Sequence, residues 1–220
     1  MSGGLKRRSA AVERVLQRIL EECGFQTARQ VYVPQWDRFH WRCTAAACER
    51  HGACFAPPCG PCDECGGALA VEREEAVLGV EARGAAVPRL YVDVTVRHAV
   101  PGDSDRLERA AAADGAVNLE AEDAKRRRYP DGLAPWRAVP FALETYGCFG
   151  SSALAQLRRL ARAQAERLGE DAAAAAGALL LRWACRLGVA LQRANAEALR
   201  RCLGADVTKG VADFAAVLAG

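Results

Sequence analysis

One acidic residue stands in the middle of an apolar run. Residues 90–96 read LYVDVTV, and Asp93 is the only charged residue among them. β-Branched and aromatic residues of this kind favour a strand. In a strand, alternate side chains share a face, so Asp93 lies with Tyr91 and Thr95 while the three valines face the other way. A buried carboxylate is costly unless it is paired or holds a cation. The run therefore predicts a core strand that also carries part of a functional site.

Hydrophobic periodicity divides the rest of the chain into helices and strands. The spacing predicts helices over 9–24, 106–129 with a break near 114–115, 151–168 and 171–203. Short apolar runs predict strands over 30–34, 75–83, 88–96 and 139–144. Strands 75–83 and 88–96 are close enough in sequence to form a hairpin. Strands interleaved with helices indicate an α/β protein with a mixed sheet flanked by helices.

Composition sets broad limits on this fold. The chain has 220 residues, of which 51% are hydrophobic, so it can bury a sizeable core. Its net charge of +3 does not by itself indicate a partner. Because Arg182 and Arg186 follow the apolar stretch 172–181, and no secretory signal precedes it, we expect an intracellular protein that does not bind a membrane.

Four of the ten cysteines form two closely spaced pairs. The pairs are Cys43-x4-Cys48 and Cys62-x2-Cys65, and Gly66-Gly67 follows the second pair. Four thiolates in this arrangement suit a tetrahedral Zn²⁺ ion, and disulfides are rare inside cells. The sequence therefore predicts a structural zinc site. Such a closed site has no open position for catalysis.

The segment around these cysteines leaves other ligand sets open. Residues 35–69 are rich in cysteine, proline, glycine and aromatic residues and show no periodicity, which indicates an inserted module. The module also contains Cys54, Cys59 and His51. A set that uses Cys59 together with Cys62 is one alternative.

A second group of charged residues follows Asp93 on a predicted helix. Glu122, Lys125 and Tyr129 are spaced i, i+3 and i+7, so they form one stripe. Lys125 stands out because only three of the 30 basic residues are lysines. Arg126, Arg127 and Arg128 form a basic patch that could face phosphate groups.

Together these residues resemble a known domain. The resemblance lies in the block YVDVTV at 91–96, the helix AExxKxxxY at 121–129 and the run VPFALETYG at 139–147. In this order they are similar to the restriction-like endonuclease domain of site-specific non-LTR retrotransposons, which belongs to the PD-(D/E)XK nuclease superfamily. The resemblance covers residues 9–203 apart from 35–69. It implies a core made of 1–34 and 70–203, an inserted zinc-binding module at 35–69 and a tail at 204–220.

The resemblance also implies a function. It suggests a Mg²⁺- or Mn²⁺-dependent endonuclease that acts on duplex DNA in the nucleus, joined to a reverse-transcriptase portion in a longer polyprotein. Asp93 would be a metal ligand, Lys125 the catalytic lysine that has moved from strand to helix, and Tyr129 its neighbour one turn later. The first acidic position falls at Gly79, which has no side chain. Glu81 shares the face of Gly79 and could reach the same metal.

This departure at Gly79 leaves further functions open. A missing carboxylate weakens a Mg²⁺ site, because the ion needs charged oxygen ligands. The chain could therefore be an inactive nuclease fold that binds nucleic acid and contains zinc. It could also be a zinc-stabilised protein-interaction domain.

Overall fold

The computed structural model describes residues 2–84, 87–98, 100, 104–113, 115–132, 137–169 and 172–202. The predicted tail at 204–220 lies outside these residues. Four strands form the main sheet, in the order β1 (Gln26–Tyr32), β5 (Val77–Gly84), β6 (Val87–Arg97) and β7 (Arg137–Glu144). β5 is antiparallel to both of its neighbours, whereas β6 and β7 are parallel. The predicted mixed sheet and its central hairpin are therefore confirmed.

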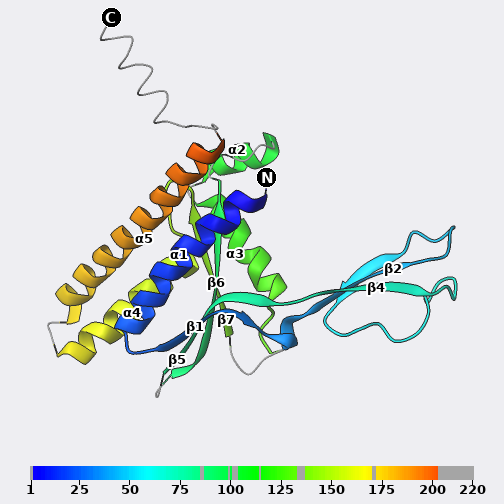
Figure 1. Cartoon of the computed structure of the whole chain (residues 1–220), viewed down its shortest axis with the longest axis horizontal. Helices are drawn as coiled ribbons and strands as arrows, with labels where there is room; N and C mark the ends of the chain where they lie inside the picture. Colours follow the sequence, from blue (N-terminus) through cyan, green and yellow to red (C-terminus); the bar gives the residue numbers. More distant parts are fainter. Residues whose placement is uncertain are drawn as a thin grey trace, which may run out of the picture.

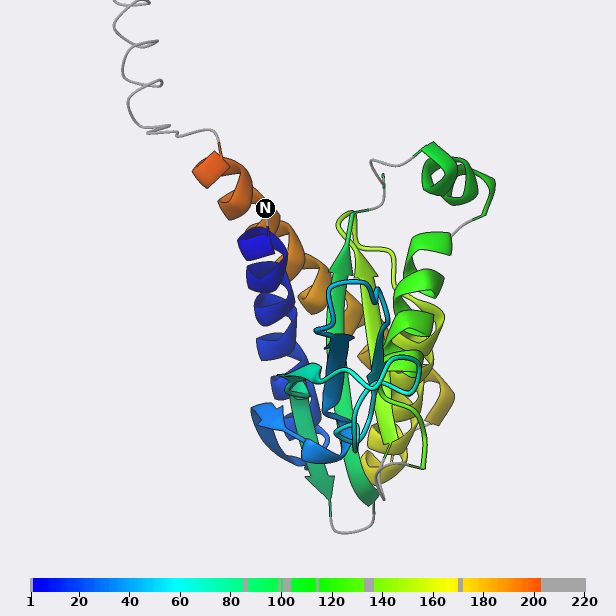
Figure 2. The same cartoon turned by 90° about the vertical axis from the view of Figure 1, so that its right-hand side faces the viewer.

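Helices flank this sheet, as the sequence predicts (Figure 1). They are α1 (Ser2–Glu22), α2 (Ser104–Ala112), α3 (Ala116–Arg128), α4 (Ser151–Leu168) and α5 (Ala172–Cys202). Figure 2 shows α1 and α5 on one side of the strands and α3 on the other. The break predicted near 114–115 separates α2 from α3.

The two faces of β6 enter different hydrophobic clusters. Val92, Val94 and Val96 lie in the main core, which the inner faces of α1, α4 and α5 complete. Tyr91 lies in a second cluster with Trp36 and Tyr129 among its members. The alternation that the sequence predicts for this strand is therefore present, and it directs Asp93 toward α3.

The cysteine-rich segment forms an arm that extends away from the main sheet (Figure 1). It contains a small antiparallel sheet in the order β3 (His51–Cys54), β2 (Arg38–Cys43) and β4 (Leu69–Glu74). A 3-10 helix, η1 (Pro34–Trp36), leads into it. The sequence shows no hydrophobic periodicity over 35–69, because these strands bury few side chains and so lack hydrophobic alternation.

A buried carboxylate fastens the root of the arm to the core. Asp37 is 2% exposed and accepts hydrogen bonds from the Ala76 amide at 2.9 Å and from Tyr32 Oη at 2.7 Å. Arg73 Nε, on β4, donates to the same carboxylate at 2.9 Å. These bonds lower the pKa of Asp37 although its burial acts to raise it. The two ends of the arm are therefore held together at one point.

α5 is long and apolar and also packs into the main core. It is the one helix in the described part of the chain that is long and apolar enough to cross a membrane, with a mean hydropathy of 1.4. Its inner face nevertheless places Trp183, Leu187 and Leu191 in the main core. Glu22 of α1 accepts a hydrogen bond from Trp183 Nε1 at 3.1 Å, which ties the two helices together. The absence of a membrane partner stays a prediction.

Candidate functional site

The structure brings Asp93 and Lys125 together across the β6–α3 interface. Lys125 Nζ lies 2.6 Å from Asp93 Oδ2. The aspartate side chain is 9% exposed, whereas the lysine side chain is 27% exposed. The sheet places the carboxylate toward α3, and the helix presents the lysine one turn before its end. An ion pair that is buried on one side and reaches solvent on the other can exchange partners with a ligand.

Tyr129 lies beside this pair at the C-terminal end of α3. Lys125 Nζ is 5.8 Å from the centre of its ring. Burial raises the pKa of Tyr129, and the nearby Asp93 charge and a hydrogen bond to that carboxylate raise it further. The Trp36 ring packs against Tyr129 at 5.5 Å between ring centres, and it meets Tyr91 edge-on at 5.8 Å. The tyrosine hydroxyl is thus held protonated, as a donor to Asp93.

A second buried carboxylate, Glu13 of α1, interacts electrostatically with Asp93 and was not predicted. Its side chain is buried and accepts a hydrogen bond from Gln30 Nε2 at 3.0 Å. Burial raises the pKa of Glu13, the Gln30 hydrogen bond partly opposes this, and repulsion from Asp93 adds to the rise. The sequence did contain a signal. Glu13 lies three and seven residues before Leu16 and Leu20, so it shares their core-facing stripe.

Gly79 gives the Glu13 carboxylate the space that it occupies. A Cβ atom at Gly79 would lie 2.8 Å from Glu13 Oε1 and 3.0 Å from Glu13 Cδ. Val80 pairs with Val92 in the sheet, so Gly79 and Asp93 are the next residues along the two strands. α1 therefore supplies a carboxylate next to Gly79, the position on β5 where the nuclease resemblance implies an acid.

The Glu81 carboxylate forms ion pairs with two arginines. Arg83 donates to its carboxylate from Nε at 2.9 Å and from a terminal nitrogen at 3.0 Å. Tyr91 Oη donates to it at 3.1 Å, and Arg89 lies 3.7 Å away. Burial alone would raise the pKa of Glu81, but these partners outweigh it and lower the pKa. The ion pairs of Glu81 thus go to arginines and not to the Asp93–Lys125 pair.

The predicted basic patch on α3 is partly used within the fold. Arg126 pairs with Glu122 at 3.2 Å and with Asp123 at 2.6 Å. Arg128 is mostly buried and pairs with Glu74 of the arm at 3.4 Å. Arg127 is exposed. Glu122 accepts hydrogen bonds from the first residues of α4, including the Ser152 amide at 2.9 Å.

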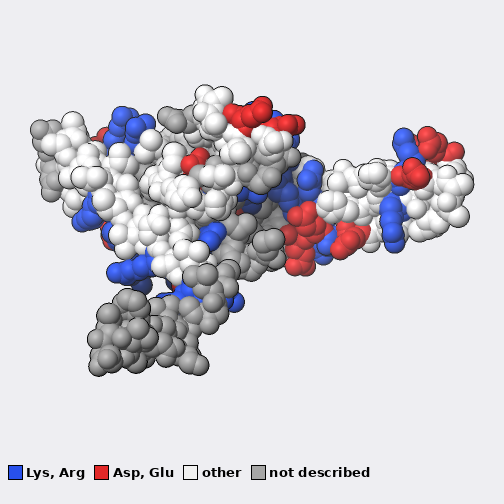
Figure 3. All heavy atoms as spheres, turned by 90° about the horizontal axis from the view of Figure 1, so that it is seen from above, with Lys and Arg blue, Asp and Glu red and all other residues white. Residues whose placement is uncertain are grey.

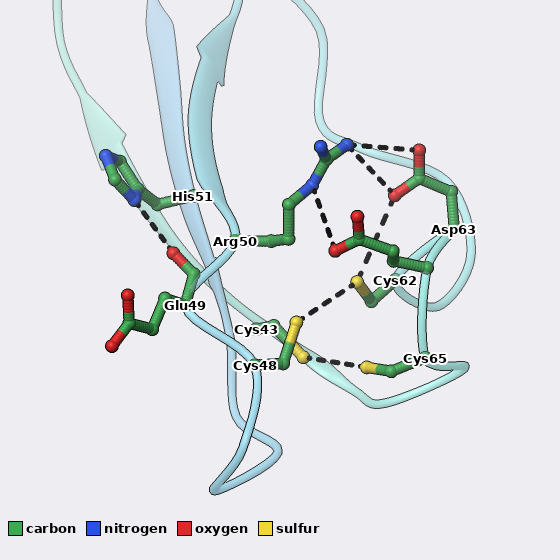
Figure 4. A network of polar contacts seen from close by, with 9 residues as sticks. Cys43, Cys48, Glu49, Arg50, His51, Cys62, Asp63 and Cys65 are labelled. Carbon is green, nitrogen blue, oxygen red and sulfur yellow. Dashed lines mark hydrogen bonds and ion pairs between the residues drawn. The ribbon is translucent and has the colours of Figure 1, made fainter.

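The four cysteines predicted to bind zinc meet at the tip of the arm (Figure 4). The sulfur atoms of Cys43, Cys48, Cys62 and Cys65 all lie within 4.8 Å of one another. The alternative ligands point elsewhere: Cys54 donates to the Ala56 carbonyl at 2.8 Å, Cys59 to the Pro57 carbonyl, and the His51 ring contacts the Glu49 carbonyl. The cluster could hold a metal ion such as zinc.

The backbone around these sulfur atoms favours thiolates. Amide groups of Glu64 and Cys65 are the main cause that lowers the pKa of Cys62 to about 7. Gly67 allows the chain to approach closely, because a Cβ there would lie 3.0 Å from Cys43 Sγ and 3.2 Å from Cys65 Sγ. Such amide-lined, closely packed thiols bind a soft cation readily when they lose their protons.

Comparisons with known proteins place no further constraint on this site. No family model matches the chain, and no curated protein matches it. The buried Asp93 carboxylate pairs with Lys125, and the buried Glu13 carboxylate feels the charge of Asp93. Groups of this kind could bind a hard cation beside an anionic ligand.

Proposed function

We propose that this chain is a divalent-metal-dependent DNA endonuclease domain of the PD-(D/E)XK type, with Glu13, Asp93 and Lys125 at its centre. The observation that carries the proposal is the 2.6 Å pair between the Lys125 ammonium and Asp93, with a second buried carboxylate close by. Two acids and a lysine held around a mixed sheet, here Asp93 on β6 and Glu13 and Lys125 on the helices α1 and α3, are the working parts of that nuclease type. The resemblance of residues 91–96 and 121–129 supports the same assignment.

The donor set suits Mg²⁺ or Mn²⁺. These ions prefer carboxylate oxygens, and Glu13 and Asp93 provide them from two separate elements. Repulsion between the two carboxylates contributes to the raised pKa of Glu13, and a cation between them would relieve it. Bound there, such an ion would supply an activated water and charge neutralisation at the phosphate. Because arginines already neutralise Glu81, we assign the second ligand to Glu13.

The remaining residues position the reacting groups. Lys125 has enough exposure to contact a phosphate oxygen or a water molecule while it stays within reach of Asp93. Tyr129 stays protonated and orients the Asp93 carboxylate by donating a hydrogen bond to it. Neither residue needs to move far, since the Trp36 and Tyr91 rings pack around Tyr129.

The four cysteines have a structural role in this proposal. Cys43, Cys48, Cys62 and Cys65 would hold one Zn²⁺ ion and stabilise the arm. Four thiolates fill a tetrahedral coordination shell, so no position is left for a substrate. We place the protein in the nucleus, where duplex DNA is the substrate.

A nicking assay on supercoiled plasmid tests the proposal. Cleavage should require added Mg²⁺ or Mn²⁺ and should fall by at least about a hundredfold in Asp93→Asn and in Glu13→Gln. Glu81→Gln is the matched control, because it removes a buried carboxylate that is held by arginines. Circular dichroism verifies that each variant is folded. Cleavage that survives in Asp93→Asn, or that needs no metal, would overturn the proposal.

A specific observation supports a second candidate function, an inactive nuclease fold that binds DNA. Position 79 carries no carboxylate, and Lys125 already neutralises Asp93. This candidate predicts salt-sensitive DNA binding without cleavage under any metal. Binding should then be unchanged in Asp93→Asn. The plasmid assay and a binding titration on the same preparation separate the two functions.

A further inference from the structure

Arginine dominates a groove between α1 and α5. The two helices lie side by side in Figures 1 and 2, and the groove between them has a volume of about 990 Å³. Six residues from each helix line it. Its charged residues are Arg7, Arg14, Arg18, Arg193, Arg201 and Glu197. The other lining residues are five alanines and Val15.

Most of this positive charge is not neutralised within the protein. Five arginines against one glutamate give the groove a larger surplus than the net charge of +3 for the whole chain. Glu197 pairs with Arg201. Within the described ranges, the other four arginines of the groove form no ion pair. In contrast, Arg73, Arg83 and Arg186 pair with carboxylates elsewhere in the fold.

The shape and length of the groove suit a phosphate chain. Alanines at its floor leave room for a ligand backbone between the arginines of the two helices. From Arg7 to Arg18, α1 rises about 17 Å at 1.5 Å per residue. Along the axis of duplex DNA each strand has a phosphate about every 3.4 Å, so a groove of this length can reach several phosphates. Arginine is well suited to such contacts because its planar group binds phosphate oxygens in pairs.

We propose that the α1–α5 groove binds the phosphodiester backbone of duplex DNA. α1 carries Glu13 toward Gly79 and, at the next residue, Arg14 into the groove, so one rigid helix joins the two surfaces. The choice of duplex DNA as ligand rests on the proposed function. Binding in the groove requires no metal and no catalytic residue.

An anionic membrane surface would attract the same charges, but the lining argues against it. Proteins that lie on membranes insert large apolar side chains next to their basic residues. The apolar residues of the groove are only alanines and Val15, and its arginines line a concave surface. Binding to lipid vesicles is therefore measured separately from binding to DNA.

The test uses fluorescence anisotropy with a labelled 20-base-pair duplex and no added divalent ion. The double variant Arg14→Gln/Arg193→Gln removes one exposed arginine from each wall. Its matched control, Arg158→Gln/Arg162→Gln, removes two exposed arginines of α4. Loss of two phosphate contacts should reduce the slope of log K against log salt by about 2 and weaken binding at least about tenfold at 100 mM salt. The control should bind as the wild type does.

The outcomes separate this inference from the proposed function. If the groove variant binds DNA more weakly than the wild type, and the wild type never cleaves DNA, the inference is supported and the nuclease function is contradicted. If the wild type cleaves DNA but the groove variant binds DNA as tightly as the wild type, the result supports the nuclease and contradicts the inference. Equal losses in the groove variant and its control would indicate general surface charge and overturn the inference. Binding to phosphatidylserine vesicles but not to DNA would also overturn it.

Discussion

Glu13 makes the stability of the metal-free protein depend on pH. Its pKa in the folded state is raised above the ordinary value of 4.5 by burial and by Asp93. The folded state therefore binds this proton more tightly than the unfolded state does. The resulting stabilisation is fully present below pH 4.5 and is lost as the pH rises through the raised pKa of the folded state.

We therefore expect Glu13→Gln, which mimics the protonated side chain, to be more stable than the wild type at pH 7 when no Mg²⁺ is present. Urea unfolding of both proteins from pH 4 to pH 8 measures the difference, which should grow as the pH rises. Mg²⁺ at about a hundred times its Kd should then stabilise the wild type by about 2.7 kcal/mol and leave the variant unchanged. An equal Mg²⁺ effect on both would show that Glu13 is not a ligand.

Gly79 offers a second test at the scale of single residues. Gly79→Asp restores the acid of the nuclease pattern, but its Cβ would lie 2.8 Å from Glu13 Oε1. Overpacking of this kind costs about 1–3 kcal/mol. The single variant should therefore melt at a lower temperature than the wild type in a calorimetric scan.

The double variant Glu13→Ala/Gly79→Asp moves the carboxylate from the helix to the strand. We expect it to recover part of the lost stability and to respond to Mg²⁺, because Asp93 regains an acidic neighbour. A single variant as stable as the wild type would mean that the Glu13 side chain does not need this space.

The sequence predicted Asp93 and Lys125 as partners but not Glu13. Asp93 interrupts a strongly apolar strand and Lys125 is one of three lysines, so both residues stand out. Glu13 is one charged residue among several on an amphipathic helix. Only the packing of Glu13 against Gly79 in the folded chain shows its role. Its place on the core-facing stripe is the local signal, but the contact with Gly79 depends on long-range packing that the sequence does not display.

At the scale of elements, the arm has little to hold it together except the cysteine cluster. Among the residues of its three strands only Cys43 is buried, and Figure 3 shows both acidic and basic groups on its surface. Structural zinc contributes about 10–16 kcal/mol in small zinc-binding peptides, far more than such a sheet gains from packing. The fold of the arm should therefore depend on the metal.

Cys62→Ser should lower the zinc content from one ion per chain to nearly none and unfold the arm. Hydrogen exchange should show lost protection over 38–54 and 69–74 and unchanged protection in β6. Cys59→Ser is the control, because Cys59 lies outside the cluster. In the wild type, zinc affinity should fall as the pH falls, because protons compete for Cys48 and Cys65, whose pKa values are raised, and below about pH 7 for Cys62 as well. Retained zinc in Cys62→Ser would point to another ligand set.

The elements of the core were predicted more closely than those of the arm. The predicted helix 151–168 has the bounds of α4, and the predicted strand 139–144 lies within β7. Both bury a continuous apolar stripe, which periodicity detects. α1 begins at Ser2, before the predicted start, because its first turns carry no such stripe. Trp36 packs against Tyr91 and Tyr129, a contact that is set by the tertiary fold and has no local signal.

At the scale of the whole molecule, the chain enters and leaves the arm at neighbouring points. The Val33 amide donates to the Ala76 carbonyl at 2.8 Å, and Tyr32 pairs with Val77 in the main sheet. The main core includes no residue of β2, β3 or β4. The arm therefore behaves in this fold as an insertion between two paired strands.

Replacement of residues 38–74 by a short glycine-serine linker should leave the core folded. The variant keeps Trp36 over Tyr129, but Asp37 loses Arg73 and remains buried with its other two donors. A buried acceptor that loses a charged partner costs about 1–3 kcal/mol. At about 2–4 °C per kcal/mol for a chain of this size, the melting temperature should fall by about 2–12 °C.

Thermal melting followed at 222 nm tests this, with Arg73→Gln in the full-length chain as the control for the lost ion pair. A linker variant that melts without cooperativity, while Arg73→Gln melts cooperatively, would show that the arm is part of the core's folding unit.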